Sequence, residues 1–212
     1  MISGASPCTG GLGVARVLIV AGFCGCAAGA SGADAPEGWN INRLMRDLAQ
    51  VDSARARFVE RKELAMLSAP LESSGTLVYT APDRLEKRTL KPREENLLLE
   101  GERLTLESKA RNQRRTFALR EQPVIGAFVE GIRSTLAGDL ATLRRYYRVS
   151  LEGSERQWRL MLEPVDPGMQ NVISEIRIGG SGTWIDTIDI VESNGDRSVM
   201  TITRDEAADA PR

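Results

Sequence analysis

The stretch LESSGTLVYTAPDRLEKRTL, residues 71–90, contains two runs of alternating side chains on either side of a proline. Leu77 and Tyr79 share one face of an extended chain, and Leu85 resumes the alternation after the proline. Pro82 fixes φ and removes a backbone donor, which favours a turn between two strands. Because so short a link allows only antiparallel pairing, the stretch predicts a meander with one apolar and one charged face.

The same pattern of short alternating runs and tight links continues along most of the chain. The links Gly153-Ser154-Glu155 and Asn194-Gly195-Asp196 are typical of hairpin turns, and 165–171 is predicted to be a longer loop. Parallel strands would need long crossovers between them. The sequence therefore predicts about eleven antiparallel strands, at 55–64, 74–80, 84–90, 94–99, 103–108, 114–119, 147–151, 157–163, 172–178, 184–192 and 198–204.

Two details of these strands bear on packing. In the first strand Phe58, Leu64 and Met66 share a parity that would face a core, whereas Glu60 and Lys62 interrupt the apolar pattern. Before the proline turn, the small residue Gly75 predicts that neighbouring backbone or a helix comes close.

Helical spacing appears before the first six strands and again before the last five. Residues 39–49 form an apolar stripe with Asn40 or Asn42 as the cap. Residues 123–137 form a second stripe, and Pro123 suits its first turn. Gly126 and Gly131 make this second helix either a moving part or a close-packing surface. A short third helix is expected to follow, through Leu140, Leu143 and Tyr147.

A sheet of about eleven strands must curl or split. A curled sheet has a concave apolar face, and the helices between the two groups of strands are the natural cover for it. The fold class predicted is mainly β with α.

The N-terminal residues 1–33 are predicted to be a secretory signal. Arg16 is their only charge, and it precedes an apolar run at 17–23 that is too short to span a bilayer. Small residues follow, so cleavage is expected before Asp34, and a lipid anchor at Cys24 or Cys26 is the alternative. The folded domain is then expected over 34–204, with a disordered tail at 205–212.

Composition excludes several classes of function. There is no histidine, and all three cysteines, the third being Cys8, lie in the predicted signal. The exported chain would therefore lack the common ligands of zinc and copper and every residue set for a Ser-His or Cys-His triad. Removing Arg16 leaves 27 basic against 29 acidic residues, a net charge of −2, which gives no general attraction to nucleic acid. No metal, cofactor or enzymatic activity is expected.

The order of these elements resembles that of the periplasmic outer-membrane lipoprotein carrier family, LolA. The likeness lies in the signal, the first helix, the strand ARFVERKE, the hairpin SGTLVYTAPDRLEK, the strand GERLTLES, the helical insert and the strand-rich end. In that family an aromatic-containing strand precedes the pattern G-x-L-x-x-x-x-P-x-x-x-x-W/K. The matching residues here are Phe58, Gly75, Leu77, Pro82 and Leu85.

The resemblance implies an incomplete antiparallel β-barrel with a helical lid over an apolar cavity. It implies a periplasmic carrier, a monomer that takes an acylated lipoprotein or lipid-like cargo from an inner-membrane export complex to an outer-membrane acceptor. The residues that it places in the cavity wall are Phe58, Leu77, Tyr79, Leu85, Leu97, Leu99, Leu104, Phe128, Ile132, Trp158 and Leu160.

Two departures from the family favour a cargo other than lipoprotein. Ala81 stands where the carriers often have a basic residue before the turn proline, and the strands stop near Arg204, without the C-terminal extension. The alternative function is a periplasmic sensor or protein-binding module on the same scaffold. The arginine pairs 114–115 and 144–145 are expected either to meet an anionic surface or to form solvated faces.

Overall fold

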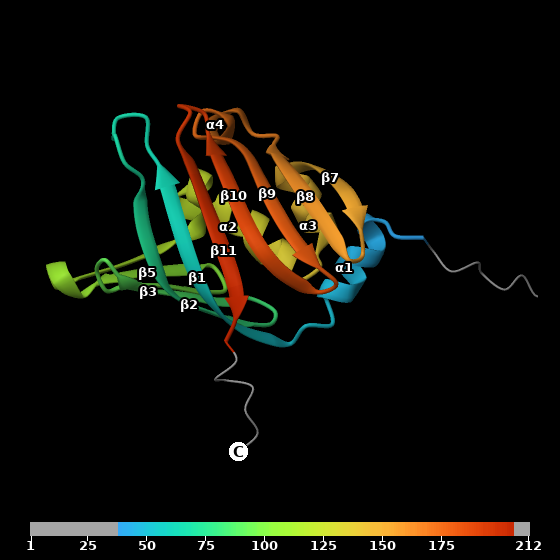
Figure 1. Cartoon of the computed structure of the whole chain (residues 1–212), viewed down its shortest axis with the longest axis horizontal. Coiled ribbons are helices and arrows are strands. Elements are labelled where there is room, and N and C mark those ends of the chain that lie inside the picture. Colours follow the sequence, from blue (N-terminus) through green and yellow to red (C-terminus); the bar gives the residue numbers. More distant parts are fainter. Residues whose placement is uncertain (1–37, 206–212) are drawn as a thin grey trace, which may run out of the picture. The chain divides into compact units, whose positions relative to one another are not determined.

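One curved antiparallel sheet with helices on its concave side makes up the chain over residues 38–205, which are the residues that the computed structural model describes (Figure 1). Within them the sheet has eleven strands in the order β6-β5-β4-β3-β2-β1-β11-β10-β9-β8-β7. Strands β6 and β7 are its two free edges, so the barrel is not closed. The predicted fold class, an incomplete antiparallel barrel with helices, is confirmed.

The strands follow the period-two runs of the sequence closely. The first six are β1 Ser53–Glu63, β2 Leu71–Thr80, β3 Arg84–Lys91, β4 Glu95–Glu100, β5 Arg103–Ser108 and β6 Gln113–Ala118. The last five are β7 Tyr147–Ser154, β8 Gln157–Pro164, β9 Ile173–Ser181, β10 Trp184–Glu192 and β11 Arg197–Arg204.

The two groups of strands join where the first strand meets the last. β1 pairs with β11 from Ala56↔Arg204 to Glu63↔Arg197, and on its other side β1 pairs with β2. In Figure 1 the teal β1 and the red β11 run side by side. Through this pairing the first and last strands of the domain form the middle of the sheet, and the concave face is continuous from β4 to β9.

Four α-helices lie within the described residues: α1 Ile41–Leu48, α2 Pro123–Leu136, α3 Leu140–Tyr146 and α4 Pro167–Gln170. Asn40, one of the two residues predicted to cap the first helix, is the N-cap of α1. Its side chain accepts a hydrogen bond from the Arg43 N–H. Pro123 opens α2, also as predicted. The short helix α4 lies in the stretch predicted to be a loop. Asp166 caps it by accepting from the Met169 N–H, at 3.0 Å.

The main core lies between the helices and the β8–β9 part of the sheet. Leu44 and Leu48 of α1 and Leu143 of α3 are no more than 1 % exposed, and they pack with Leu160 and Ile176 of the sheet. Burying each such side chain contributes about 1.5–3 kcal/mol. A smaller cluster joins α2 to β4 and β5 through Val129, Leu99 and Leu104. The helices are thus fixed at two places, and the concave face between those places is left open.

Gly75 confirms the predicted close approach of backbone. A Cβ at this position would lie 1.9 Å from the Arg88 carbonyl oxygen of β3, so only glycine fits. Met66 corrects another expectation, because it lies in the loop after β1 and is 87 % exposed instead of facing a core. The turn between β7 and β8 also falls later than predicted, since β7 continues through Ser154.

The predicted signal at 1–33, with Cys24 and Cys26, lies outside the described residues. So does the predicted tail, except Asp205, whose carboxylate accepts from Arg57 Nε at 3.0 Å.

Candidate functional site: an apolar cavity beneath α2

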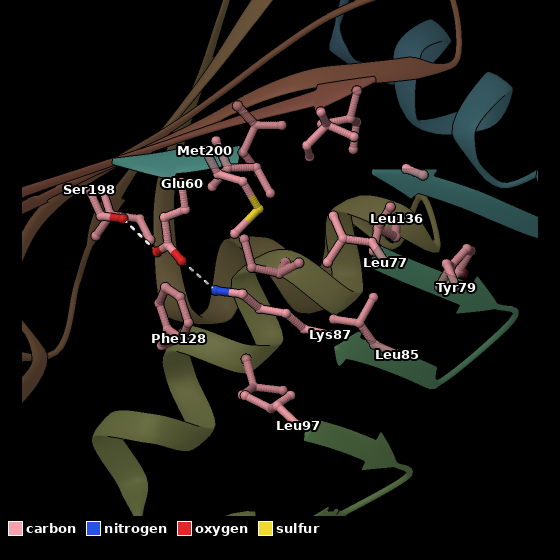
Figure 2. A pocket seen from close by; sticks show the side chains of 18 of the residues that line it. Glu60, Leu77, Tyr79, Leu85, Lys87, Leu97, Phe128, Leu136, Ser198 and Met200 are labelled. Carbon is pink, nitrogen blue, oxygen red and sulfur yellow. Dashed lines mark hydrogen bonds and ion pairs between the residues drawn. The ribbon is translucent and has the colours of Figure 1, made fainter. Parts of the chain in front are cut away.

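A cavity of about 430 Å³ lies between α2 and the concave face of the sheet. It is lined from one side by β1 to β4, from the other by β9 to β11, and from above by α2. Of the 28 lining residues, all but seven have apolar side chains. Its volume is within the range of roughly 300–1,000 Å³ that is typical of small-molecule sites. Figure 2 shows several of these side chains converging on one space.

Seven residues of the predicted lining set lie in the wall of this cavity. They come from three strands and the lid helix, and Figure 2 labels five of them. The strand residues of this set lie on the inward face of the sheet because they alternate with outward residues along each strand. Leu77 pairs with Lys87, and Tyr79 pairs with Leu85, on this same face. The seven residues are Leu77, Tyr79, Leu85, Leu97, Leu99, Phe128 and Ile132.

The other four predicted lining residues do not reach the wall. Trp158 and Leu160 of β8 are buried in the main core, where helices fill the space in front of them. Leu104 of β5 is covered by α2 in the smaller cluster. Phe58 of β1 is 2 % exposed and packs against Lys87, whose Nζ lies 4.9 Å from the centre of the ring. All four point to the concave side, and neighbouring side chains cover them.

A charged cluster lies in the wall where apolar residues were expected. Glu60 is 5 % exposed and shares the inward face of β1 with Phe58, so it continues the inward pattern that it was expected to interrupt. One carboxylate oxygen accepts from Lys87 Nζ at 2.6 Å and the other from Ser198 Oγ at 2.7 Å (Figure 2). Lys62 Nζ is 3.7 Å from the same carboxylate. Parity was the available signal, because Glu60 shares the face of Phe58 on β1 and Lys87 shares the face of Leu85 on β3.

Glu60 remains ionised because its partners outweigh its burial. Burial raises the pKa of the Glu60 carboxyl, while the charge and hydrogen bond of Lys87, the Ser198 hydroxyl and the charge of Lys62 lower it. The net result is a pKa below the ordinary value of 4.5. The cavity therefore holds a fixed ion pair at neutral pH.

Tyr79 places a second polar group in the wall. Its hydroxyl is buried and forms no hydrogen bond with any described residue. Burial, with a smaller contribution from the Asp83 carboxylate, raises the pKa of this phenol, so the hydroxyl stays protonated and remains a donor.

The cover of the cavity, α2, is attached near its C-terminal end. Arg133 Nη1 donates to the Gly101 carbonyl oxygen in the β4–β5 turn at 3.0 Å. The same guanidinium forms an ion pair with Glu130 on α2 and lies 3.5 Å from the Glu102 carboxylate. The Arg133 side chain is only 18 % exposed. This contact joins the lid helix to the sheet on one side of the cavity.

Gly131 is a close-packing point of α2. A Cβ on this residue would lie 2.8 Å from the Tyr147 hydroxyl oxygen and 2.9 Å from two carbons of the ring. The Tyr147 hydroxyl in turn donates to the Ala127 carbonyl oxygen at 2.9 Å. Of the two interpretations of this glycine, packing is the one that the contacts support.

Two of the exposed arginines form ion pairs across neighbouring strands. Arg148 pairs with Glu163 across β7 and β8 at 2.8 Å, and Arg114 lies 3.2 Å from Glu107 across β5 and β6. No group of three or more His, Cys, Asp or Glu side chains among the described residues is arranged to hold a metal ion. None of the described helices is long and apolar enough to cross a membrane.

Comparison with known proteins finds similarity over most of the chain. A family model described as outer membrane lipoprotein carrier protein LolA-like matches residues 33–211. The outer-membrane lipoprotein carrier protein of Methylibium petroleiphilum is 26 % identical over 183 residues, which are 85 % of this chain and 83 % of that protein.

Solved structures with similar folds are distant in sequence. A LolA superfamily protein from Nitrosomonas europaea is 10 % identical, with 78 % of this chain and 92 % of that chain covered and a TM-score of 0.44. The complex of MucA and MucB from Pseudomonas aeruginosa matches at 12 % identity, with 77 % and 56 % covered and a TM-score of 0.40.

Proposed function

Because the chain belongs to the LolA-like family of outer membrane lipoprotein carrier proteins, we propose that it is a periplasmic carrier that holds acyl chains in the cavity beneath α2. The cargo is the acylated end of a lipoprotein or another lipid-like amphiphile, which the protein passes towards the outer membrane. Donation by an inner-membrane complex and delivery to an outer-membrane acceptor complete the cycle.

The observation that carries this proposal is the unfilled apolar space on the concave face. Side chains such as Leu77, Ile188 and Met200 reach it from strands on both sides, while Phe128 and Leu136 of α2 cover it. In an ordinary core these groups would be packed against one another, at the density of an organic crystal. An open space with this lining suits an apolar chain.

Binding of this kind requires a step that releases the cargo. Each buried methylene contributes about 0.8 kcal/mol, so one long acyl chain supplies on the order of 10 kcal/mol before association costs. Such a ligand leaves slowly unless the site opens. The lid helix α2 is the element whose displacement would expose the cavity, and this role needs no catalytic residue.

The experiment that tests the proposal is native mass spectrometry of the protein purified from the periplasm without detergent, with identification of every bound molecule. We expect an acyl amphiphile or lipoprotein in about stoichiometric amount. Met200→Trp, which fills the cavity, should lose the ligand, whereas Val199→Trp, on the opposite face of the same strand, should keep it.

An empty protein would count against the carrier, provided that it also fails to take up an added fluorescent fatty acid while folded. That pair of results would favour the protein-binding module on the same scaffold.

A further inference from the structure

The cavity wall contains an ion pair between Glu60 and Lys87, in which, among the described residues, the Glu60 carboxylate has several hydrogen-bond and charge partners and the Lys87 ammonium has one hydrogen-bond partner. Glu60 on β1 and Lys87 on β3 approach each other across β2, at 2.6 Å between Oε2 and Nζ. A pair this well buried gives little net stability compared with apolar residues of the same size. Fold stability alone therefore gives no reason for a charge pair at this place in an otherwise apolar wall.

Glu60 is saturated by its neighbours. Its carboxylate accepts from Lys87, from Ser198 Oγ at 2.7 Å and from Ser73 Oγ at 3.3 Å, and Lys62 Nζ lies 3.7 Å away. These donors come from four different strands and hold the carboxylate in one position. Glu60 therefore acts as an anchor within the wall and has little capacity left for a ligand.

Lys87 has donors to spare. An ammonium group has three N–H bonds. Within residues 38–205, the side-chain hydrogen bonds of Lys87 go to Glu60 alone, and its Nζ lies 4.9 Å from the centre of the Phe58 ring. Two N–H donors remain, on a side chain that lines the cavity and is 24 % exposed. Figure 2 shows this side chain extending among the apolar residues of the site.

Among the charged residues of the wall, Lys87 is the one best placed to bind an anionic group inside the cavity. Lys62 is 50 % exposed and so lies nearer to solvent, and Glu192, the remaining charged lining residue, is on β10. The chain has only four lysines, and two of them line the cavity. A desolvated ammonium with free donors attracts a carboxylate or phosphate oxygen.

We propose that Lys87, held in place by Glu60, binds the anionic headgroup of the amphiphile whose acyl chain occupies the cavity. The headgroup oxygens accept from the two free N–H groups of Lys87, and the chain extends along the apolar wall. This inference rests on the proposed carrier function and adds a preference for carboxylate or phosphate over uncharged headgroups.

The test compares decyl phosphate with decanol by isothermal titration calorimetry, both below their aggregation limits. We expect the wild type to bind decyl phosphate at least tenfold more tightly than decanol. Lys87→Met should remove this preference and change decanol binding less than threefold. Lys91→Met, which removes the same charge from β3 but outside the cavity wall, should keep the preference.

Glu60→Gln separates headgroup binding from general damage to the ion pair. Both E60Q and K87M break the same ion pair, so a purely structural role predicts weaker binding in both. If Lys87 binds the headgroup, the preference for decyl phosphate is lost only in K87M, because E60Q leaves the ammonium in the wall and keeps an amide oxygen beside it that accepts its hydrogen bond. Circular dichroism should confirm that both variants are folded.

Each remaining outcome is decisive. Equal affinity of the wild type for decyl phosphate and decanol would overturn the headgroup proposal and leave the carrier standing. Absence of binding by either probe would overturn both. Inorganic phosphate should not compete with decyl phosphate, and competition at similar concentration would mean a site for free anions, contrary to the proposal.

Discussion

At the residue scale, the buried Glu60 makes the cavity sensitive to acid. Its pKa lies below 4.5 in the folded protein because Lys87 and Ser198 favour the ionised carboxylate more strongly than burial opposes it. A group with a depressed pKa stabilises the fold above its unfolded-state pKa. This stabilisation is lost as the pH falls through the folded-state value.

Glu60→Gln should therefore lower the free energy of unfolding by about 1.5–3 kcal/mol at pH 7, since a charged hydrogen bond is replaced by a neutral one. The difference from the wild type should shrink as the pH falls below 4.5. Urea unfolding between pH 7 and pH 3 measures both effects. A difference that stays constant over this range would mean that Glu60 is not ionised in the fold.

Gly131 offers a second test at this scale. Gly131→Ala should destabilise the protein by about 1–3 kcal/mol, because the added methyl would overlap the Tyr147 side chain. In a Tyr147→Leu background the same change should cost less, since the contact is gone. Thermal unfolding of the four proteins in this cycle gives the coupling. Equal costs in both backgrounds would show that Tyr147 is not the obstacle.

At the element scale, α2 covers the cavity and is joined to its neighbours by polar contacts of Arg133 and of the Ala127 carbonyl. Its apolar side chains contact the wall, and Arg133 joins it to the β4–β5 turn through the Gly101 carbonyl. A lid must open at a free energy below that of global unfolding. The Arg133 contact is placed to set that opening free energy.

Arg133→Ala should accelerate hydrogen exchange of the α2 amides by about tenfold or more, since a charged hydrogen bond contributes about 1.5–3 kcal/mol. Amides of β8 and β9, which lie in the main core, should keep their rates. Arg144→Ala on the exposed face of α3 is the matched control and should change neither. Equal acceleration in all elements would indicate global destabilisation and not an attached lid.

The strands themselves were predictable from sequence because their signals are local. Alternation of side chains and Gly, Asn or Pro in the links predicted all eleven strands, and Pro123 marked the start of α2. Parity also assigned the inward face correctly at Leu77 and Leu97. The alternation of side chains along a strand does not predict which side chains of other elements will cover an inward residue. Trp158 and Leu160 face inward, yet helices cover them.

The charged part of the cavity and the order of the strands depend on long-range pairing. Glu60 interrupts the apolar pattern in sequence, but pairing of β1 with β11 and β2 brings Ser198 and Ser73 beside it, and Lys87 follows one strand further on. No feature within a single strand predicts these partners. Its parity with Phe58 was the only local sign that Glu60 points inward.

At the scale of the whole molecule, the sheet is curved enough to enclose a space but remains open between β6 and β7. The two halves of the chain meet at β1 and β11, and the cavity lies across this junction with walls from both halves. Cargo in that space would contact strands from both groups. Binding should therefore stabilise the entire sheet, by mass action on the folded state.

Quenching of Trp184 fluorescence by a fatty acid brominated along its chain tests whether an acyl chain occupies the cavity. Trp184 lines the cavity, whereas Trp39 and Trp158 do not. We predict saturable quenching in the wild type and loss of most of it in Trp184→Phe. Absence of quenching in the folded wild type, or equal quenching in Trp184→Phe, would contradict an acyl chain in the cavity.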